Sequence, residues 1–172
     1  HGLSSAPDCI LLKPLTHLPW EVFFSDLGGT GGGSTAAGNS LVLNSTAALY
    51  TNQTYRTWGD VMPTSTVFTV NGNNANAASV AMIAYCFANT EGYIKSGSYE
   101  GNGNADGSFV YCGFRPALII TKSLDSTSDW QLFDDKRLGY NVDNNEMQLN
   151  EQDAQVTTDM IDILSNGFKF RI

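Results

Sequence analysis

Two stretches that lie far apart in the chain carry nearly the same pattern. Residues 7–13 (PDCILLK) and 20–26 (WEVFFSD) return as residues 116–122 (PALIITK) and 130–135 (WQLFDD). Each pair is followed by a short run that ends in asparagine, LVLN at 41–44 and MQLN at 147–150. The spacing is far longer than the repeat of about 20–50 residues in solenoids and propellers. The pattern therefore predicts an internal duplication, two copies of one supersecondary unit.

The second copy is the shorter of the two. The first copy continues through an apolar run at residues 79–88 (SVAMIAYCFA), and no such run follows residues 168–170 (FKF). The chain also begins at His1 without a methionine. We interpret the sequence as part of a longer polypeptide whose last strand, the counterpart of residues 80–88, is absent or supplied by another chain. An exposed sheet edge at that place is expected.

Composition favours strands. Charged residues make up 15% of the chain, glycine occurs 17 times, and asparagine, serine and threonine are abundant. Few helix-forming residues and many turn-forming ones are typical of short strands joined by turns. We predict a single all-β domain over residues 1–172, an antiparallel β-sandwich of jelly-roll type. Repeat 1 is expected at residues 1–90, a linker at 91–108, and the incomplete repeat 2 at 109–172.

The charge balance excludes some classes of partner. The formal net charge is -8 and the nine basic residues are scattered, whereas phosphate binding needs clustered Lys and Arg. No apolar run of 18 or more residues is present, as a membrane-spanning helix would require. The sequence predicts neither nucleic-acid binding nor membrane insertion.

Local patterns predict individual hairpins. Residues 6–13 and 20–24 are expected to pair as two strands joined by a turn. At the end of the chain, Ile161 and Ile163 alternate with polar residues before Asn166 and Gly167, and two phenylalanines alternate after them. Asn166 and Gly167 tolerate the positive φ angles of a two-residue turn, so a tight hairpin is expected there. A helical turn capped by residues 157–159 is the alternative.

Three cysteines, Cys9, Cys86 and Cys112, lie in apolar strand-like runs. An unpaired buried cysteine packs as a small apolar side chain, so free thiols are expected. A bridge between Cys86 and Cys112 is the alternative.

Catalytic chemistry has few candidates. The histidines are His1 and His17, and neither lies in a recognisable motif of a catalytic triad or a metal site. Glycoside hydrolysis needs only two carboxylates beside a cleft. The acidic residues considered for such a pair are Asp26, Glu100, Asp129, Asp134, Asp135 and Glu146. Asp26 and Asp134 occupy matching positions of the repeats, which indicates a structural role, and we expect the protein not to be an enzyme.

Two kinds of binding site are suggested by residue type. Asn102, Asn104 and Asp106 alternate as oxygen ligands do in calcium loops, although no glutamate follows at the required distance. They are the candidate ligands for calcium, and no other cofactor is expected. Sugars stack on exposed aromatic rings, and the candidate ligand-binding residues are Trp58, Tyr93, Tyr99 and Tyr140. Partial burial in the core is the alternative for each ring.

Several short motifs, in order along the chain, resemble a known family. They are HGL with AP at residues 1–7, IAYCFA at 83–88, EGY at 91–93, GSY with GNG at 97–103, FVY and GFRP at 109–116, and LSNGFK at 164–169. This set is similar to a β-rich domain of unknown function from virion proteins of tailed bacteriophages, mostly marine, often in tail fibres. The resemblance implies a β-sandwich module on a phage particle, presented in several copies, and it brings no catalytic residues.

The sequence therefore leads to a functional hypothesis with two rivals. The hypothesis is a virion module of a tail fibre that attaches to the host surface and recognises a glycan, assembled with other virion proteins as a homo-oligomer, a trimer being favoured. The first rival is a capsid-decorating or purely architectural virion protein. The second is a polysaccharide depolymerase. Loops at residues 28–34, 71–76 and 100–107 are expected to carry recognition.

Overall fold

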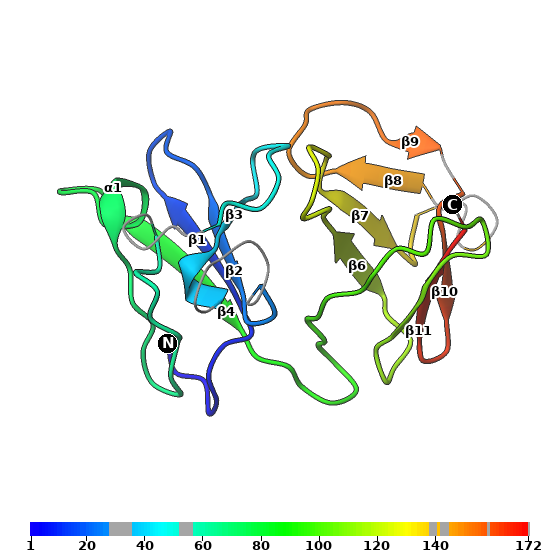
Figure 1. Ribbon diagram of the computed structural model, residues 1–172, viewed down its shortest axis with the longest axis horizontal. Helices are drawn as coiled ribbons and strands as arrows, with labels where there is room; N and C mark the ends of the chain where they lie inside the picture. Colours follow the sequence, from blue (N-terminus) through cyan, green and yellow to red (C-terminus); the bar gives the residue numbers. More distant parts are fainter. Residues whose placement is uncertain (28–35, 52–56, 138–140, 142–144, 158, 172) are drawn as a thin grey trace. The chain divides into compact units, whose positions relative to one another are not determined.

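The fold is all-β. The computed structural model describes residues 1–27, 36–51, 57–137, 141, 145–157 and 159–171. Within these residues the strands are antiparallel and form three sheets, accompanied by two helical turns, η1 (Ala36–Gly38) and α1 (Gly72–Ala75) (Figure 1). The prediction of an all-β, antiparallel fold is confirmed. None of the helices in the described ranges is long and apolar enough to span a bilayer.

Backbone contacts divide the chain into two compact units. Unit 1 comprises His1–Asn89, Ser96–Ser98 and Ser123–Ser128, and unit 2 comprises Thr90–Lys95, Tyr99–Lys122 and Asp129–Ile172. Unit 1 thus holds most of the expected repeat 1, unit 2 holds most of repeat 2, and the expected linker is shared between them. That the two units form one domain stays a prediction.

Unit 1 is built on one four-stranded sheet. Its strand order is β3 (Leu41–Val42), β2 (Glu21–Phe24), β1 (Cys9–Pro14) and β4 (Met82–Phe87). The hairpin of β1 and β2 is the one expected from the sequence. Ile10 and Leu12 alternate on β1 and are 0% and 2% exposed, as a half-buried strand requires. The ring of Phe23 meets the buried ring of Trp58 edge-on at 5.7 Å, so an aromatic pair lies in the core of this unit.

Unit 2 packs two sheets face to face. One has the order β6 (Leu118–Thr121), β7 (Gln131–Asp134), β8 (Asn145–Gln148) and β9 (Val156–Thr157). The other has the order β10 (Ile161–Leu164), β11 (Gly167–Phe170) and β5 (Phe109–Tyr111). One buried cluster joins them, formed by Ile119, Phe133, Ile161, Ile163, Phe168 and Phe170. Side chains from both sheets fill the space between them, which is the construction of a β-sandwich. A jelly-roll order of strands stays a prediction.

The hairpin of β10 and β11 is present, but its turn lies one residue earlier than expected. Leu164 pairs directly with Gly167, so Ser165 and Asn166 form the turn. Gly167 is needed for space, because a Cβ at this position would lie 2.1 Å from the carbonyl oxygen of Val110 on β5. The prediction that Gly167 lies in the turn is therefore wrong, because this glycine is the first residue of β11. The alternative of a capped helical turn is wrong, since Val156–Thr157 is strand β9.

Units 1 and 2 each contain the same pattern of strand pairing and the same kind of hydrogen bond. The matching cross-strand pairs are Ile10 with Phe23 and Ile119 with Phe133, then Val22 with Leu41 and Leu132 with Met147. In each unit an asparagine side chain accepts the backbone N–H of the tryptophan that precedes the second strand, Trp20 or Trp130. These agreements have the form that a duplication would leave. The duplication itself stays a prediction.

The three cysteines are free thiols. Cys9 is buried, whereas Cys86 and Cys112 are half-buried. The predicted free thiols are confirmed, and the alternative bridge between Cys86 and Cys112 is absent from the structure.

Candidate binding surface

Two exposed aromatic rings lie on the outer side of the three-stranded sheet of unit 2. Phe109 and Tyr111 are two residues apart on β5, so their side chains leave the strand on the same side. They are 45% and 65% exposed, while Val110 between them packs against the buried cluster. We call the outer side of β5, β11 and β10 in this unit the aromatic face. Its members are Phe109, Tyr111, Asp162, Leu164, Gly167 and Lys169.

Gly167 lies at the centre of the aromatic face. It pairs directly with Tyr111 on one side and with Leu164 on the other. The terminal carbon of the Phe109 ring would lie 3.1 Å from a Cβ at this position, so the ring leans over the glycine. Gly167 is buried, with the exposed side chains of Tyr111 and Leu164 on the two neighbouring strands. The glycine lets the Phe109 ring lie close to the sheet, and the exposed rings of Phe109 and Tyr111 suit a planar or ring-shaped ligand.

Charged groups adjoin the aromatic face. Lys169 pairs across the sheet with Phe109 and with Asp162, and its ammonium contacts the carboxylate of Asp106. Arg171 donates from Nε to Asp162 Oδ2 over 2.9 Å. The hydrogen bond and charge of Lys169 lower the pKa of Asp106, and the bond to Asp162 raises the pKa of Arg171. The face therefore combines rings with fixed donors and acceptors, the two elements that sugar recognition uses.

Tyr99 and Tyr93 lie in unit 2 as well, in different settings. The ring of Tyr99 stacks on Phe170 with centroids 4.9 Å apart, and burial raises the pKa of its hydroxyl. Tyr99 is 43% exposed, so it closes the end of the core and offers one side to solvent. Tyr93 is 77% exposed on a tight turn, in which Thr90 and Ile94 exchange two backbone hydrogen bonds of 2.9 Å.

Trp58 is a wrong prediction for a sugar-binding ring. It is 2% exposed, in unit 1, between Phe23 and Phe68, whose ring centroids lie 5.7 and 6.4 Å away. Tryptophan has the largest apolar surface of any side chain, and this copy is used to fill the core. Tyr140, the fourth candidate, lies outside the described residues.

The candidate calcium loop is closed by its own hydrogen bonds. The side-chain oxygens of Asn102 and Asn104 accept the backbone N–H groups two residues on, over 3.1 and 2.9 Å. Asp106 contacts the ammonium of Lys169, which lies where a metal ion would compete for the same oxygen. In the described part of the chain, no group of three or more His, Cys, Asp and Glu side chains is arranged to hold a metal ion. The loop geometry is that of successive Asx turns.

Two of the acidic candidates for hydrolysis, Asp134 and Asp135, form ion pairs with arginine side chains. Asp134 accepts from Arg137 Nε over 2.6 Å, and Asp135 pairs with Arg115 at 3.1 Å. Burial acts to raise the pKa of Asp134, but the hydrogen bonds that it accepts from Arg137 and two backbone N–H groups, with the charge of Arg137, together lower it. These carboxylates are fixed by ion pairs, which is the arrangement of a structural brace.

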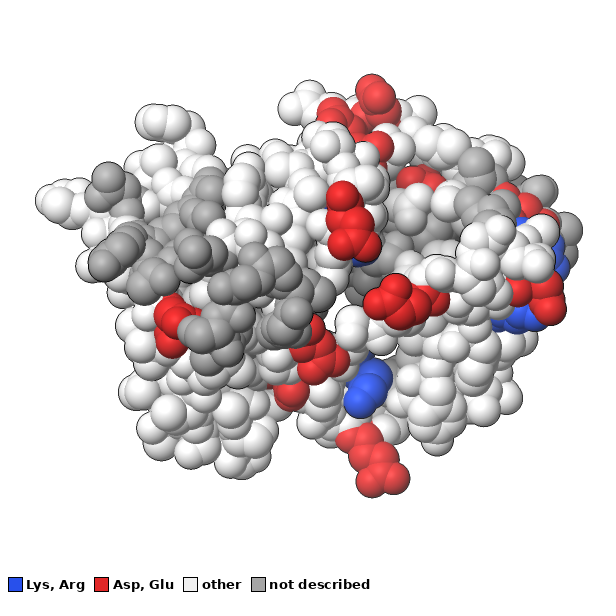
Figure 2. Space-filling view, viewed as in Figure 1, with Lys and Arg blue, Asp and Glu red and all other residues white. Residues whose placement is uncertain are grey.

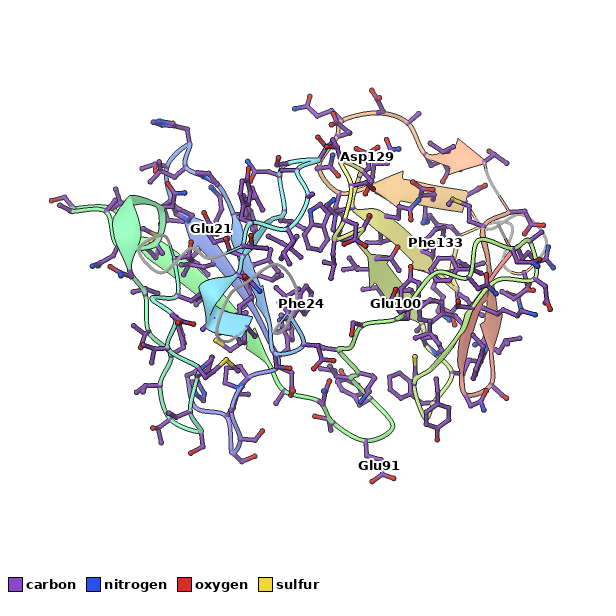
Figure 3. All side chains as sticks on the ribbon, viewed as in Figure 1. Glu21, Phe24, Glu91, Glu100, Asp129 and Phe133 are labelled. Carbon is purple, nitrogen blue, oxygen red and sulfur yellow. The ribbon has the colours of Figure 1, made fainter. Side chains whose placement is uncertain are left out.

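Three further acidic candidates lie in different parts of unit 2. Asp129 lies on the loop before β7 and Glu100 on the segment before β5, well separated from each other (Figure 3). Glu146 is 4% exposed and accepts from Gln131 Nε2 over 3.3 Å, and burial raises its pKa. A buried carboxyl with a raised pKa is a feature of some active sites. Here it faces a glutamine.

The sequence contains a signal for the aromatic face. In a strand, alternation places the side chains of Phe109 and Tyr111 on one side and that of Val110 on the other, and the inward Val110 decides which side faces solvent. The need for a glycine at position 167 could not be predicted from the neighbouring residues, because it depends on the close approach of β5.

Charge is dispersed over the surface. On the face drawn in Figure 2, acidic side chains occur throughout and the visible basic ones lie in small separate groups beside acidic ones. Such a surface does not attract a polyanion, in agreement with the net charge of -8.

The chain was compared with known protein families, curated proteins and solved structures. A family model described as "Domain of unknown function (DUF7483)" matches residues 1–172, the whole chain. No curated protein and no solved structure matches it.

Proposed function

The chain belongs to the family described as Domain of unknown function (DUF7483), and we propose that it is an attachment module of a phage virion, part of a tail fibre, that binds a host-surface glycan. One observation carries the glycan-binding part: Phe109 and Tyr111 are exposed on the same side of a rigid sheet. The virion part is supported by motifs such as residues 83–88 and 113–116, which resemble phage virion proteins.

The mechanism is binding, with no bond made or broken. A sugar ring presents C–H groups on its flat side, and these pack against the exposed rings of Phe109 and Tyr111. Lys169 and Asp162 lie on the same side of the sheet, where they can exchange hydrogen bonds with hydroxyl groups. Strands hold these side chains more firmly than loops would, so little ordering is needed on binding.

Weak single sites suffice for attachment when several copies act together. A shallow face such as this one encloses little of a ligand, so each contact is expected to be weak. Copies on a homo-oligomer, which we propose to be a trimer assembled with other virion proteins, bind a surface of repeated glycans with an avidity far above that of one site.

The test is a glycan array probed with the chain displayed in several copies. The Phe109→Ala and Tyr111→Ala double variant should bind at least about tenfold more weakly, the effect of losing about 1.4 kcal/mol. Tyr85→Ala is the matched control, because Tyr85 is also a strand aromatic, 47% exposed, but belongs to unit 1. Equal loss in both variants, or in neither, would contradict the assignment to the aromatic face.

An architectural virion protein is the second candidate, and one observation favours it. Ile120, Leu132 and Met147 face one another across three strands of unit 2, and Ile120 and Met147 are 46% and 44% exposed. An apolar row across a sheet is typical of a protein interface. Absence of binding to any glycan, together with assembly into particles that depends on this row, would favour the architectural role.

The depolymerase alternative has less support. Asp134 and Asp135 are held in ion pairs. We expect no release of reducing sugar from host polysaccharide, and release that disappears on changing a carboxylate pair to amides would promote this alternative.

A further inference from the structure

Strand β6 is the last strand of its sheet, whereas its counterpart in unit 1 is not. In the described part of unit 2, β6 pairs with β7 alone. In unit 1, β1 pairs with β2 on one side and with β4 on the other. The two hairpins have the same register, so β6 and β1 hold equivalent positions in their sheets. The side of β1 that β4 covers is therefore not paired on β6 by any strand of the described residues.

The open side of β6 presents backbone groups. The carbonyl of Ala117 accepts the N–H of Asp135 over 3.1 Å, so Ala117 faces β7. Backbone groups of successive residues point to opposite sides of an antiparallel strand. Those of Leu118 and Ile120 therefore point away from β7.

Unit 1 shows the same alternation with the open side occupied. The carbonyl of Asp8 accepts the N–H of Ser25 over 2.9 Å, as Ala117 accepts from Asp135. The next residues on the β4 side, Cys9 and Leu11, pair with Phe87 and Tyr85. Position by position, Cys9 and Leu11 correspond to Leu118 and Ile120.

The side chains at the β6 edge are those of an interface. Leu118 and Ile120 are 56% and 46% exposed. Proteins usually protect an edge strand with charges, a proline or a bulge, because an exposed apolar edge pairs with other strands. Between Leu118 and Thr121 the strand has none of these residues.

We propose that the edge of β6 binds an extended strand of another polypeptide with the residue pattern of β4. The strand would run antiparallel to β6, as β4 does to β1, and place an aromatic residue opposite Leu118 and another opposite Ile120. Backbone hydrogen bonds supply affinity, and aromatic side chains beside aliphatic ones cover the exposed apolar surface. A strand of this chemistry completes unit 2 in the way that β4 completes unit 1.

The test supplies such a strand by a tether. The sequence of residues 80–88, with serine in place of Cys86, is fused after Ile172 through a Gly/Ser linker of about 20 residues, which spans on the order of 25 Å. The fusion should raise the unfolding temperature by at least about 4 °C over a fusion that carries the same residues in scrambled order. The amides of Leu118 and Ile120 should exchange with solvent at least about tenfold more slowly in the native-sequence fusion.

Two variants of the fusion locate the bound strand. Ile120→Pro removes an N–H that points to the open side, and proline is tolerated at that kind of position on an edge strand. This variant should lose the rise in unfolding temperature, whereas Ile120→Val, which keeps the N–H, should retain it. Self-association of the unfused chain that Ile120→Pro abolishes would also support the proposal, since a second copy carries β4.

Three results would overturn the proposal. One is equal unfolding temperature and equal amide exchange in the native and scrambled fusions. Another is protection that appears on amides of a different strand. The third is a rise in unfolding temperature that the Ile120→Pro variant retains in full.

Discussion

The side-chain oxygen of Asn150 accepts the backbone N–H of Trp130 over 2.7 Å. The same bond joins Asn44 to Trp20 in unit 1 over 2.9 Å. In both units the tryptophan N–H lies just before a strand, and the asparagine lies just after the strand paired with it. In unit 2 the bond is reinforced, because Asn150 also donates to Asp129 over 2.7 Å.

Replacing this asparagine with alanine should lower the free energy of unfolding more in unit 2 than in unit 1. Asn150→Ala takes away the acceptor of a backbone N–H next to a side chain that is 2% exposed, so we expect a loss of about 1–2 kcal/mol in the free energy of unfolding. Asn44→Ala should cost less, since Trp20 is half-buried. Urea unfolding of both variants measures the difference. Asn150→Asp keeps an acceptor oxygen and should recover part of the loss.

Gly167→Ala should damage the three-stranded sheet. The new methyl group would meet the carbonyl oxygen of Val110 at 2.1 Å, and backbone cannot yield as a flexible side chain does. We expect a loss of about 1–3 kcal/mol, measured by thermal unfolding. Gly101→Ala is the matched control, because no atom lies within 4 Å of its added methyl group. Similar losses in both variants would contradict the close approach of β5 to β11.

Glu146 should make stability depend on pH. Burial raises its pKa in the folded state above the unfolded value of about 4.3, so folding favours the protonated form. Its contribution is therefore complete below the unfolded pKa and is lost as the pH rises through the folded pKa. Urea unfolding of Glu146→Gln between pH ~3 and ~8 should show a smaller decline toward neutral pH than the parent. Glu91→Gln, at an exposed position, should follow the parent, and a parallel decline in all three would be contrary evidence.

Cys9 should be the slowest of the three thiols to react. Burial, followed by the nearby Cys86 and Asp8, raises the pKa of Cys9 to about 12, so almost no thiolate forms at neutral pH. Burial also raises the pKa of Cys86 and Cys112, but both are half-buried and more accessible. A disulfide reagent should titrate Cys86 and Cys112 in the folded chain, and Cys9 only after denaturant is added. Rapid labelling of Cys9 in the native chain would show that β1 opens readily.

The strands and hairpins could largely be predicted from the sequence, because strand pairing follows local patterns. Two apolar runs joined by a turn predicted the hairpin of β1 and β2, and alternation predicted that of β10 and β11. The matched runs around Trp20 and Trp130 predicted where equivalent strands lie. Side-chain burial was harder to predict from the sequence, because it depends on which residues pack against the side chain from elsewhere in the chain. Trp58 looks like a surface ring beside polar residues, yet it is inserted beside Phe23, a contact that no local pattern encodes.

The candidate site was only partly predictable for the same reason. Tyr93 and Tyr99 are exposed, as expected for a turn and a connecting segment. The exposure of Phe109 and Tyr111 could be predicted only by knowing which side of β5 is buried, and the position of the Phe109 ring over Gly167 depends on the pairing of β5 with β11.

The asparagine that holds each tryptophan closes chain segments of different length. Twenty-four positions separate Trp20 from Asn44, and twenty separate Trp130 from Asn150, yet the same bond forms. The number of residues between the tryptophan and the asparagine therefore does not determine how the strands pair. Closing a loop that is a few residues longer costs little free energy. The connections between β2 and β3 and between β7 and β8 are accordingly the places to graft foreign peptides for display.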